Sequence, residues 1–257
     1  MTDVLGEMSD FNIVQEARKA IKRINKTIRE TALEYSYYLS QLTGCHVYLK
    51  LENQQIAGSF KIRGAANLML SLSTKEKELG VVASSSGNHG AAVAYLLDKL
   101  RVEGTIYLPE NVSESKVDAL RTYGAEVSFL GKDVVETERF ARRIAEEKQI
   151  ILIPPYNHPD IIAGQATIAL ELERQIKRMD VVLVPVGGGG LISGIAGYLK
   201  SLNRQIRIIG CQPQNSPVMF ESLRAGQIIE MDSMPTISDG TAGGIEKDSI
   251  TFDLCRE

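Results

Sequence analysis

Cysteine and histidine, the residues of disulfide frameworks and zinc sites, are scarce in this chain. The 257 residues include three of each. Cys45, Cys211 and Cys255 lie far apart and show no C-x-x-C spacing, which favours reduced thiols and a cytoplasmic protein. The histidines are scattered as well, so the sequence predicts no metal site.

The chain also lacks an excess of charge of either sign. It carries 29 Lys and Arg against 32 Asp and Glu and has no polybasic or acidic tail, so we expect no nucleic-acid partner. Residues 1–11 contain three acidic side chains and no apolar segment typical of a secretion signal. Residues 181–199 carry no charge and approach the length of a membrane span, but they include Pro185 and six glycines. We interpret this run as a buried strand, a turn and a helix, and expect no membrane association.

Strands and helices are predicted to alternate along most of the chain. Near the start, apolar residues from Val14 to Ile28 recur at the spacing of an amphipathic helix. The alternation predicts a parallel sheet and the α/β class. The predicted strands are residues 46–51, 80–83, 105–108, 126–130, 150–153, 181–186 and 206–210, and the predicted helices that separate them are 60–71, 88–97, 113–123, 134–148, 161–178 and 191–202.

No repeat, low-complexity tract or linker divides the chain, so a domain boundary has to be predicted indirectly. The proline-rich residues 154–159 are the strongest interruption and predict a crossing between two lobes. Residues 249–257 resemble the start of a capped helix without its end. This pattern predicts that a C-terminal part is missing.

A lysine stands at the start of the predicted helix 60–71, within the sequence GSFKIRG of residues 58–64. The positive end of the helix dipole disfavours an ammonium group there. Lys61 is therefore either a solvated surface group or present in another form, such as a Schiff base with an aldehyde cofactor. Taken alone, these seven residues favour the surface lysine.

Four consecutive glycines, Gly187 to Gly190, follow a predicted strand and precede a helix. Glycines let the backbone approach an oxyanion, and the N–H groups of a helix start can bind it. The dinucleotide pattern fails because Ile192 and Ser193 stand where a further glycine belongs, and no Gly-Lys-Ser/Thr follows as in Walker A. A small phosphorylated cofactor remains.

A third loop, residues 84–90 (SSSGNHG), also joins a strand to a helix. Its hydroxyls and N–H groups suit a carboxylate, although helix capping explains the loop about as well. The three features together require a ligand that offers an aldehyde to Lys61 and a phosphate to the glycines, beside an amino-acid carboxylate. Pyridoxal phosphate meets this requirement.

These segments resemble the fold type II pyridoxal-phosphate enzymes, specifically the threonine dehydratase and serine racemase group. The resemblance runs from about residue 12 to the last residue. It implies an α/β, tryptophan synthase β-like architecture of two parallel-sheet domains whose C-terminal part is missing here. Residues 1–80 and 154–257 would form the large cofactor-binding domain, and residues 81–153 a small mobile domain inserted in it. The segments that carry the resemblance are residues 50–53, 58–65, 85–90 and 162–165 together with the four glycines.

The same resemblance implies a role for each site residue. Lys61 would carry the cofactor and act as a catalytic base, and Ser86 would be the second catalytic group. Racemase-like members place acidic cation ligands where Gln212 and Val218 stand, so the expectation of no metal is kept. The implied cofactor-binding residues are Phe60, Lys61, Asn88, Gly187, Gly188, Gly189, Gly190 and Gly240, and the implied substrate-binding residues are Ser85, Ser86, Gly87, Asn88 and His89.

The reaction that the resemblance implies is the dehydration and deamination of L-threonine or L-serine to a 2-oxo acid and ammonia. One alternative is a racemase that uses Lys61 and Ser86 as opposed bases. Another is a cofactor-binding protein without catalytic activity, because of the missing C-terminal part. The failed fingerprint disfavours an NAD-dependent oxidoreductase. We expect a cytoplasmic homodimer that acts on a small amino acid.

Overall fold

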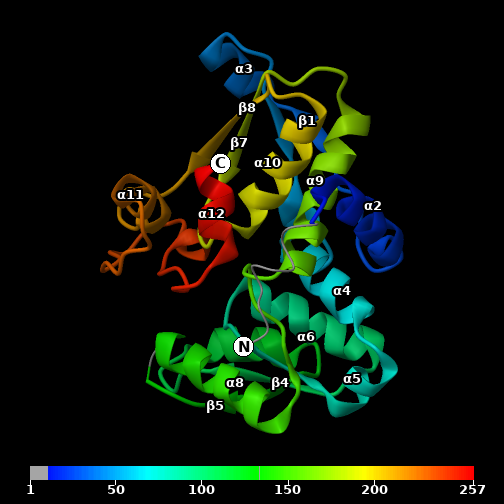
Figure 1. Ribbon diagram of the computed structural model, residues 1–257, viewed down its shortest axis with the longest axis vertical. Helices are drawn as coiled ribbons and strands as arrows, with labels where there is room; N and C mark the ends of the chain where they lie inside the picture. The colour runs from blue at the N-terminus through cyan, green and yellow to red at the C-terminus, as the bar shows by residue number, and fades with distance from the viewer. Residues whose placement is uncertain (1–10, 133) are drawn as a thin grey trace.

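The structure is a computed structural model that describes residues 11–132 and 134–257. Figure 1 shows two lobes, one above the other, with α4 (Lys61–Ser71) lying between them. Within the described residues, no helix is both long and apolar enough to cross a membrane.

The lower lobe is built on a parallel sheet with the strand order β5-β4-β3-β6. The side chains of its central strands alternate between two faces. Val82 and Tyr107 pack against α8, whereas Val81 and Ile106 belong to the core shared with α4 and α6. The elements are β3 (Val81–Ser84), β4 (Gly104–Leu108), β5 (Glu126–Phe129), β6 (Ile151–Leu152), α6 (Asn88–Leu100), α7 (Glu114–Arg121) and α8 (Val134–Lys148).

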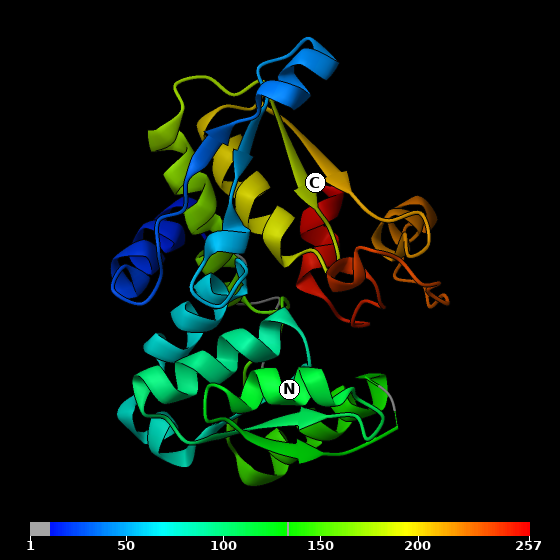
Figure 2. The same ribbon diagram turned by 180° about the vertical axis from the view of Figure 1, so that it is seen from behind.

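The upper lobe is organised around α9 (Pro159–Gln175), which packs against α2, α4 and α10. Tyr198 and Leu199 of α10 are fully buried in this core beside Ala166 and Ala169 of α9. Two strand pairs lie in this lobe and are seen from behind in Figure 2. They are the antiparallel pair β1 (Leu33–Tyr35) and β2 (Tyr48–Lys50) and the parallel pair β7 (Val181–Pro185) and β8 (Arg207–Cys211), and the flanking helices are α2 (Ile13–Ile24), α3 (Tyr37–Thr43) and α10 (Gly190–Leu202).

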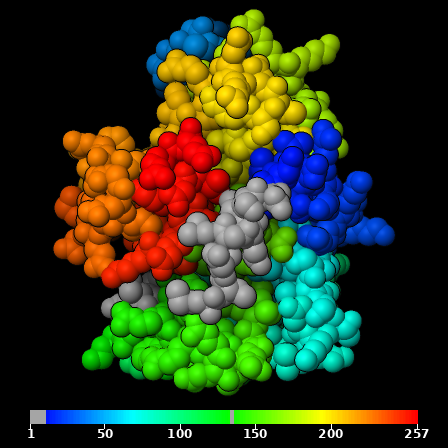
Figure 3. Space-filling view, viewed as in Figure 1, coloured from blue at the N-terminus to red at the C-terminus, as the bar shows by residue number. Residues whose placement is uncertain are grey.

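The C-terminal segment lies on the upper lobe, next to the lower lobe. In the space-filling view of Figure 3 it is drawn in red above the green surface of the lower lobe. An ion pair joins the two: Arg142 of α8 lies 3.1 Å from the carboxylate of Glu246. The remaining elements are α5 (Thr74–Leu79), α11 (Val218–Ala225), α12 (Ile250–Arg256) and the short 3₁₀ helices Glu52–Gln54 and Asp239–Thr241.

The α/β class and the parallel pairing predicted from the sequence are confirmed. The helix over residues 134–148 has the predicted bounds. Several short elements were not predicted, among them α3, α5, α11 and the three-residue β1, whose antiparallel pairing with β2 departs from the parallel pattern. The division into two domains at residues 80/81 and 153/154 stays a prediction. Residues 1–10, which the prediction assigns to the large domain, lie outside the described part of the chain.

Candidate functional site

Lys61 is the first residue of α4, and its amine lies between the two lobes. Nζ donates a hydrogen bond to the carbonyl oxygen of Pro155 at 2.8 Å and lies 5.4 Å from the centre of the Phe60 ring. Burial lowers the pKa of Lys61 to about 8, although the charge of Glu138 opposes this effect. About a tenth of the amine is therefore uncharged at pH 7, far more than for a solvated surface lysine with a pKa near 10.5.

The loop of residues 84–90 leads from β3 into α6, whose first residue is Asn88. His89 is buried, and its Nε2 lies 2.9 Å from the carbonyl oxygen of Ile153. Since a carbonyl oxygen can only accept, Nε2 must carry the proton. Burial and the charge of Lys61 lower the pKa of His89 to about 3, so the ring is neutral. His89 thereby ties the start of α6 to the end of β6.

Ser85, Ser86 and Gly87 precede Asn88 at the rim of the lower lobe. The Ser85 hydroxyl accepts a hydrogen bond from the Gly87 N–H at 3.3 Å. The two serines are half-buried, and Gly87 and Asn88 are exposed. Among the described residues no hydrogen bond joins Ser86 to Lys61, so the structure does not bring the two predicted catalytic groups into direct contact.

The four glycines form a narrow turn between β7 and α10. Gly189 has a φ of 89°, in the region that favours glycine, and α10 begins at Gly190. A Cβ on Gly188 would lie 2.4 Å from the Tyr156 ring, which leaves no room for a side chain. Within the described part of the chain, the N–H groups of Gly187, Gly188 and Gly189 donate no hydrogen bond. Free donors at a helix start in a turn without side chains fit the phosphate of a cofactor.

The predicted site residues of the two lobes approach one another through the segment 155–156 and the 3₁₀ helix at 239–241. Pro155 accepts the hydrogen bond from Lys61, and the next residue, Tyr156, packs against the glycine turn. A Cβ on Gly240 would lie 3.7 Å from the Asn88 amide nitrogen. The structure therefore gathers Lys61, the glycine turn, Asn88 and Gly240 around one region.

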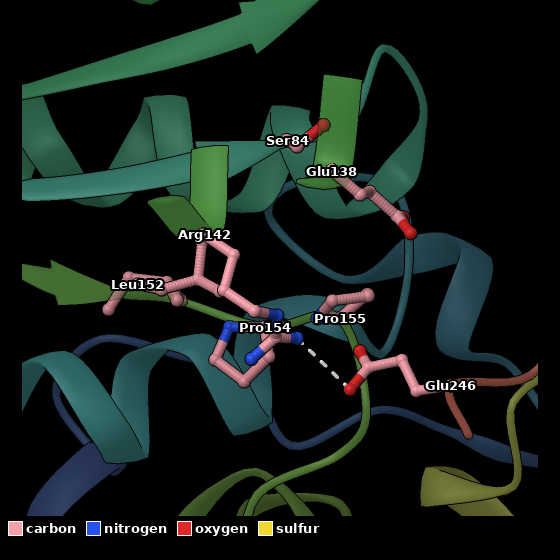
Figure 4. A pocket seen from close by; sticks show the side chains of 8 residues that line it. Ser84, Glu138, Arg142, Leu152, Pro154, Pro155 and Glu246 are labelled. Atoms are coloured by element: carbon pink, nitrogen blue, oxygen red, sulfur yellow. Dashed lines mark hydrogen bonds and ion pairs between the residues drawn. The ribbon is translucent and has the colours of Figure 1, made fainter. Parts of the chain in front are cut away.

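A group of charged residues lies next to Lys61 and was not predicted from the sequence. Figure 4 shows Glu138 and Arg142 of α8 and Glu246 around a small cavity beside Pro155, with Arg142 paired to Glu246. The cavity volume is about 20 Å³, room for about one water molecule. The lining residues are Ser84, Glu138, Arg142, Leu152, Ile153, Pro154, Pro155 and Glu246.

Glu138 and Tyr156 have altered acidity in this cluster. Burial, reinforced by the charge of Glu246, raises the pKa of Glu138 to about 7. Burial also raises the pKa of Tyr156, whose hydroxyl oxygen accepts a hydrogen bond from the Glu246 N–H at 2.9 Å. The Glu246 carboxylate accepts from Asn157 at 2.8 Å and from Arg142 at 3.1 Å. No local signal could have identified Glu138, because it stands on a charged helix and Glu246 comes from a remote segment.

Comparison with known proteins finds pyridoxal-phosphate enzymes, the class whose cofactor the glycine turn and Lys61 fit. A family model described as "Pyridoxal-phosphate dependent enzyme" matches residues 24–257. The L-threonine ammonia-lyase of Thermotoga maritima is 41% identical over 244 residues, which cover 95% of this chain and 60% of that protein. A catabolic L-threonine dehydratase of Staphylococcus aureus is 43% identical over 228 residues, 88% of this chain and 65% of that protein. The chain thus spans less than two thirds of the length of these relatives.

Solved structures of related proteins have the same fold. Maize serine racemase matches with a TM-score of 0.89 at 35% identity, over 95% of this chain and 74% of the racemase. The processed form of threonine deaminase isoform 2 from Solanum lycopersicum matches with a TM-score of 0.88 at 35% identity, over 95% of this chain and 71% of the deaminase.

Proposed function

Since this chain belongs to the family of pyridoxal-phosphate dependent enzymes, we propose that it is an ammonia-lyase that converts L-threonine or L-serine to a 2-oxo acid and ammonia. Pyridoxal phosphate is the cofactor of the family. The observation that carries the proposal is the Lys61 amine, whose pKa is lowered by burial and which lies in the same region as the glycine turn. The names of the relatives from Thermotoga maritima and Staphylococcus aureus support this substrate class.

Residues of both lobes would hold the cofactor. The free N–H groups of Gly187 to Gly189 would bind the phosphate, and Phe60, Asn88 and Gly240 would contact the ring. When bound, pyridoxal phosphate withdraws electrons from the substrate Cα and makes its proton acidic.

The chain's own groups then handle the protons. Neutral Lys61 can take a proton at Nζ, and its pKa near 8 suits a base that works close to neutral pH. Glu138, with a pKa of about 7, can hold a proton beside Lys61 and supply it to the departing hydroxyl group. The N–H groups and hydroxyls of residues 85–88 would bind the substrate carboxylate. The water lost from the substrate is regained when its nitrogen leaves as ammonia.

Racemisation is the second candidate, because the maize serine racemase fold matches with a TM-score of 0.89. It requires a second acid-base group on the face opposite Lys61, and Ser86 is the residue proposed for it. We also propose a cytoplasmic homodimer, which sedimentation of the purified protein and fractionation of cells would test.

The test compares wild type with Lys61→Ala and with Lys75→Ala, an exposed lysine of α5. After addition of pyridoxal phosphate, borohydride reduction and peptide mapping should find the cofactor on Lys61. Wild type and Lys75→Ala should release 2-oxo acid and ammonia from L-threonine, whereas Lys61→Ala should release neither. Full activity of Lys61→Ala would refute the assignment.

Two further results would replace the proposal by an alternative. D-serine formed from L-serine by wild type, but not by Ser86→Ala, would favour the racemase. Covalent capture of the cofactor without product from L-threonine or L-serine would favour a binding protein without catalytic activity.

A further inference from the structure

A buried ion-pair cluster lies two residues after Lys61 on α4. Its central members, Arg63 of α4 and Glu171 of α9, are both completely buried. The Arg63 guanidinium donates to both Glu171 oxygens, at 2.6 and 3.0 Å. It also donates to both oxygens of Glu52, at 2.8 and 2.7 Å. One guanidinium thus joins two carboxylates, each through two hydrogen bonds.

The cluster extends to the rim of the upper lobe and balances its own charge. Lys50 donates to Glu171 at 2.5 Å and to the carbonyl oxygen of Thr31 at 2.8 Å. The Thr31 hydroxyl in turn donates to Glu52 at 2.6 Å. Two cations and two carboxylates therefore link α4, α9, β2 and the segments on either side of the β1–β2 pair.

The same two helices cross at their glycines. A Cβ on Gly164 would lie 2.5 Å from the Gly64 Cα, and a Cβ on Gly64 would lie 2.5 Å from the Gln165 amide nitrogen. The backbones therefore touch one residue beyond Arg63. The crossing fixes how closely α4 and α9 approach, and the guanidinium fixes their rotation and register.

Both ends of the Lys61 hydrogen bond depend on this helix pair. Lys61 begins α4, and its acceptor Pro155 stands four residues before the first residue of α9. Other charged or titratable groups facing the amine are His89 from α6 and Glu138 from α8, both in the lower lobe. In the upper lobe, the position of the amine thus depends on α4, which carries Lys61, and on the segment before α9, which carries Pro155.

We propose that Arg63, held by Glu52 and Glu171, is a positioning residue that fixes the Lys61 amine against the Pro155 carbonyl. The importance of this amine for turnover rests on the proposed function, but its position does not. A buried ion pair gains little stability over apolar residues of the same volume, because removing the charges from water is costly. Its directional hydrogen bonds instead specify one arrangement of the two helices.

The test measures the Lys61 amine itself in cofactor-free protein. Competitive labelling with acetic anhydride over a pH series, read by peptide mass spectrometry, gives the midpoint at which Lys61 loses its proton. Wild type should give a midpoint near 8. Glu52→Gln turns one acceptor oxygen into an amide that opposes the guanidinium, and Arg63→Lys removes the two-pronged geometry. In both variants the amine should become better hydrated, and its midpoint should rise by about one unit.

Leu199→Ala is the matched control. Leu199 is fully buried in the upper-lobe core but lies on α10, outside the ion-pair cluster. The substitution loosens the same lobe without touching Arg63, so the midpoint should stay near that of wild type. Circular dichroism confirms folding at each pH, and Glu52→Gln, whose side chain is partly exposed, serves if Arg63→Lys does not fold.

Three results would overturn the proposal: a folded Glu52→Gln protein with the wild-type midpoint, a Leu199→Ala protein with an equal shift, or a wild-type midpoint near 10.5, the ordinary value. In the active protein, Glu52→Gln should lower kcat about tenfold or more and change KM less, because a displaced base slows the chemical step. If the variants show the midpoint shift but the wild-type protein has no turnover, the proposed function is refuted and the positioning role is retained.

Discussion

Replacing Lys61 with methionine is expected to stabilise the cofactor-free protein at neutral pH. Burial lowers the pKa of Lys61 from 10.5 to about 8, so folding carries a cost for the charged amine. Methionine has a similar length and no charge, and it removes this cost. It also removes the hydrogen bond to Pro155, which contributes about 1 kcal/mol.

The magnitude and its pH dependence follow from the same shift. A difference of this size corresponds to about 3 kcal/mol, which we reduce to about 2 kcal/mol because the side chain is only half-buried. After the lost hydrogen bond, Lys61→Met should gain about 1 kcal/mol at pH 7. Between pH 8 and 10.5 the unfolded chain binds more protons than the folded one. Wild-type stability therefore rises in this window, and the advantage of Lys61→Met should shrink and reverse.

Urea unfolding of both proteins, followed by circular dichroism at pH 6, 7, 8, 9 and 9.5, measures these differences. Lys75→Met, at an exposed position on α5, should change the free energy of unfolding by less than about 0.5 kcal/mol at every pH. The reasoning fails if Lys61→Met is less stable than wild type at pH 7 and the difference is the same at pH 9.5.

Three further predictions concern the surroundings of this amine. Gly188→Ala places a methyl group 2.4 Å from the Tyr156 ring, so titration with pyridoxal phosphate should show binding weakened by about tenfold or more. Unchanged affinity would contradict the proposal that the glycine turn binds the phosphate. Glu138→Gln removes a carboxyl group with a pKa of about 7, so the change in kcat with pH near pH 7 should disappear. In urea unfolding, the loss of wild-type stability as the pH rises from 4.5 to 7 should disappear as well. His89→Gln retains an N–H donor for the Ile153 carbonyl oxygen. Because His89 is neutral above about pH 3, the pH profile of kcat between pH 5 and 8 should keep its wild-type shape.

The sequence predicts the elements whose signals are local. The periodicity of residues 134–148 defines α8, and the glycine run marks the turn before α10 with its free N–H groups. The short elements around α3 have no such signal, because seven residues are too few to establish a helical period. The cluster of Glu138 with Glu246 depends on a contact between segments far apart in the chain, which no local pattern reveals.

Lys61 and Arg63 show most clearly where the limit of sequence reasoning lies. Both cations stand in the first turn of α4 and experience the same helix dipole, so local reasoning treats them alike. Burial acts to lower the pKa of both. For Arg63, the hydrogen bonds that its guanidinium donates to Glu52 and Glu171 outweigh burial and raise the pKa. Lys61 has a carbonyl oxygen as its hydrogen-bond acceptor, and its pKa falls.

This difference is set by the partners and not by the helix. Glu171 lies 108 positions along the chain from Arg63, and Pro155 lies 94 from Lys61. The fold therefore keeps Arg63 charged and lowers the pKa of Lys61 to about 8. The proposed base and the residue proposed to position it thus stand two residues apart on one helix, because each finds its hydrogen-bond partner in a different remote segment.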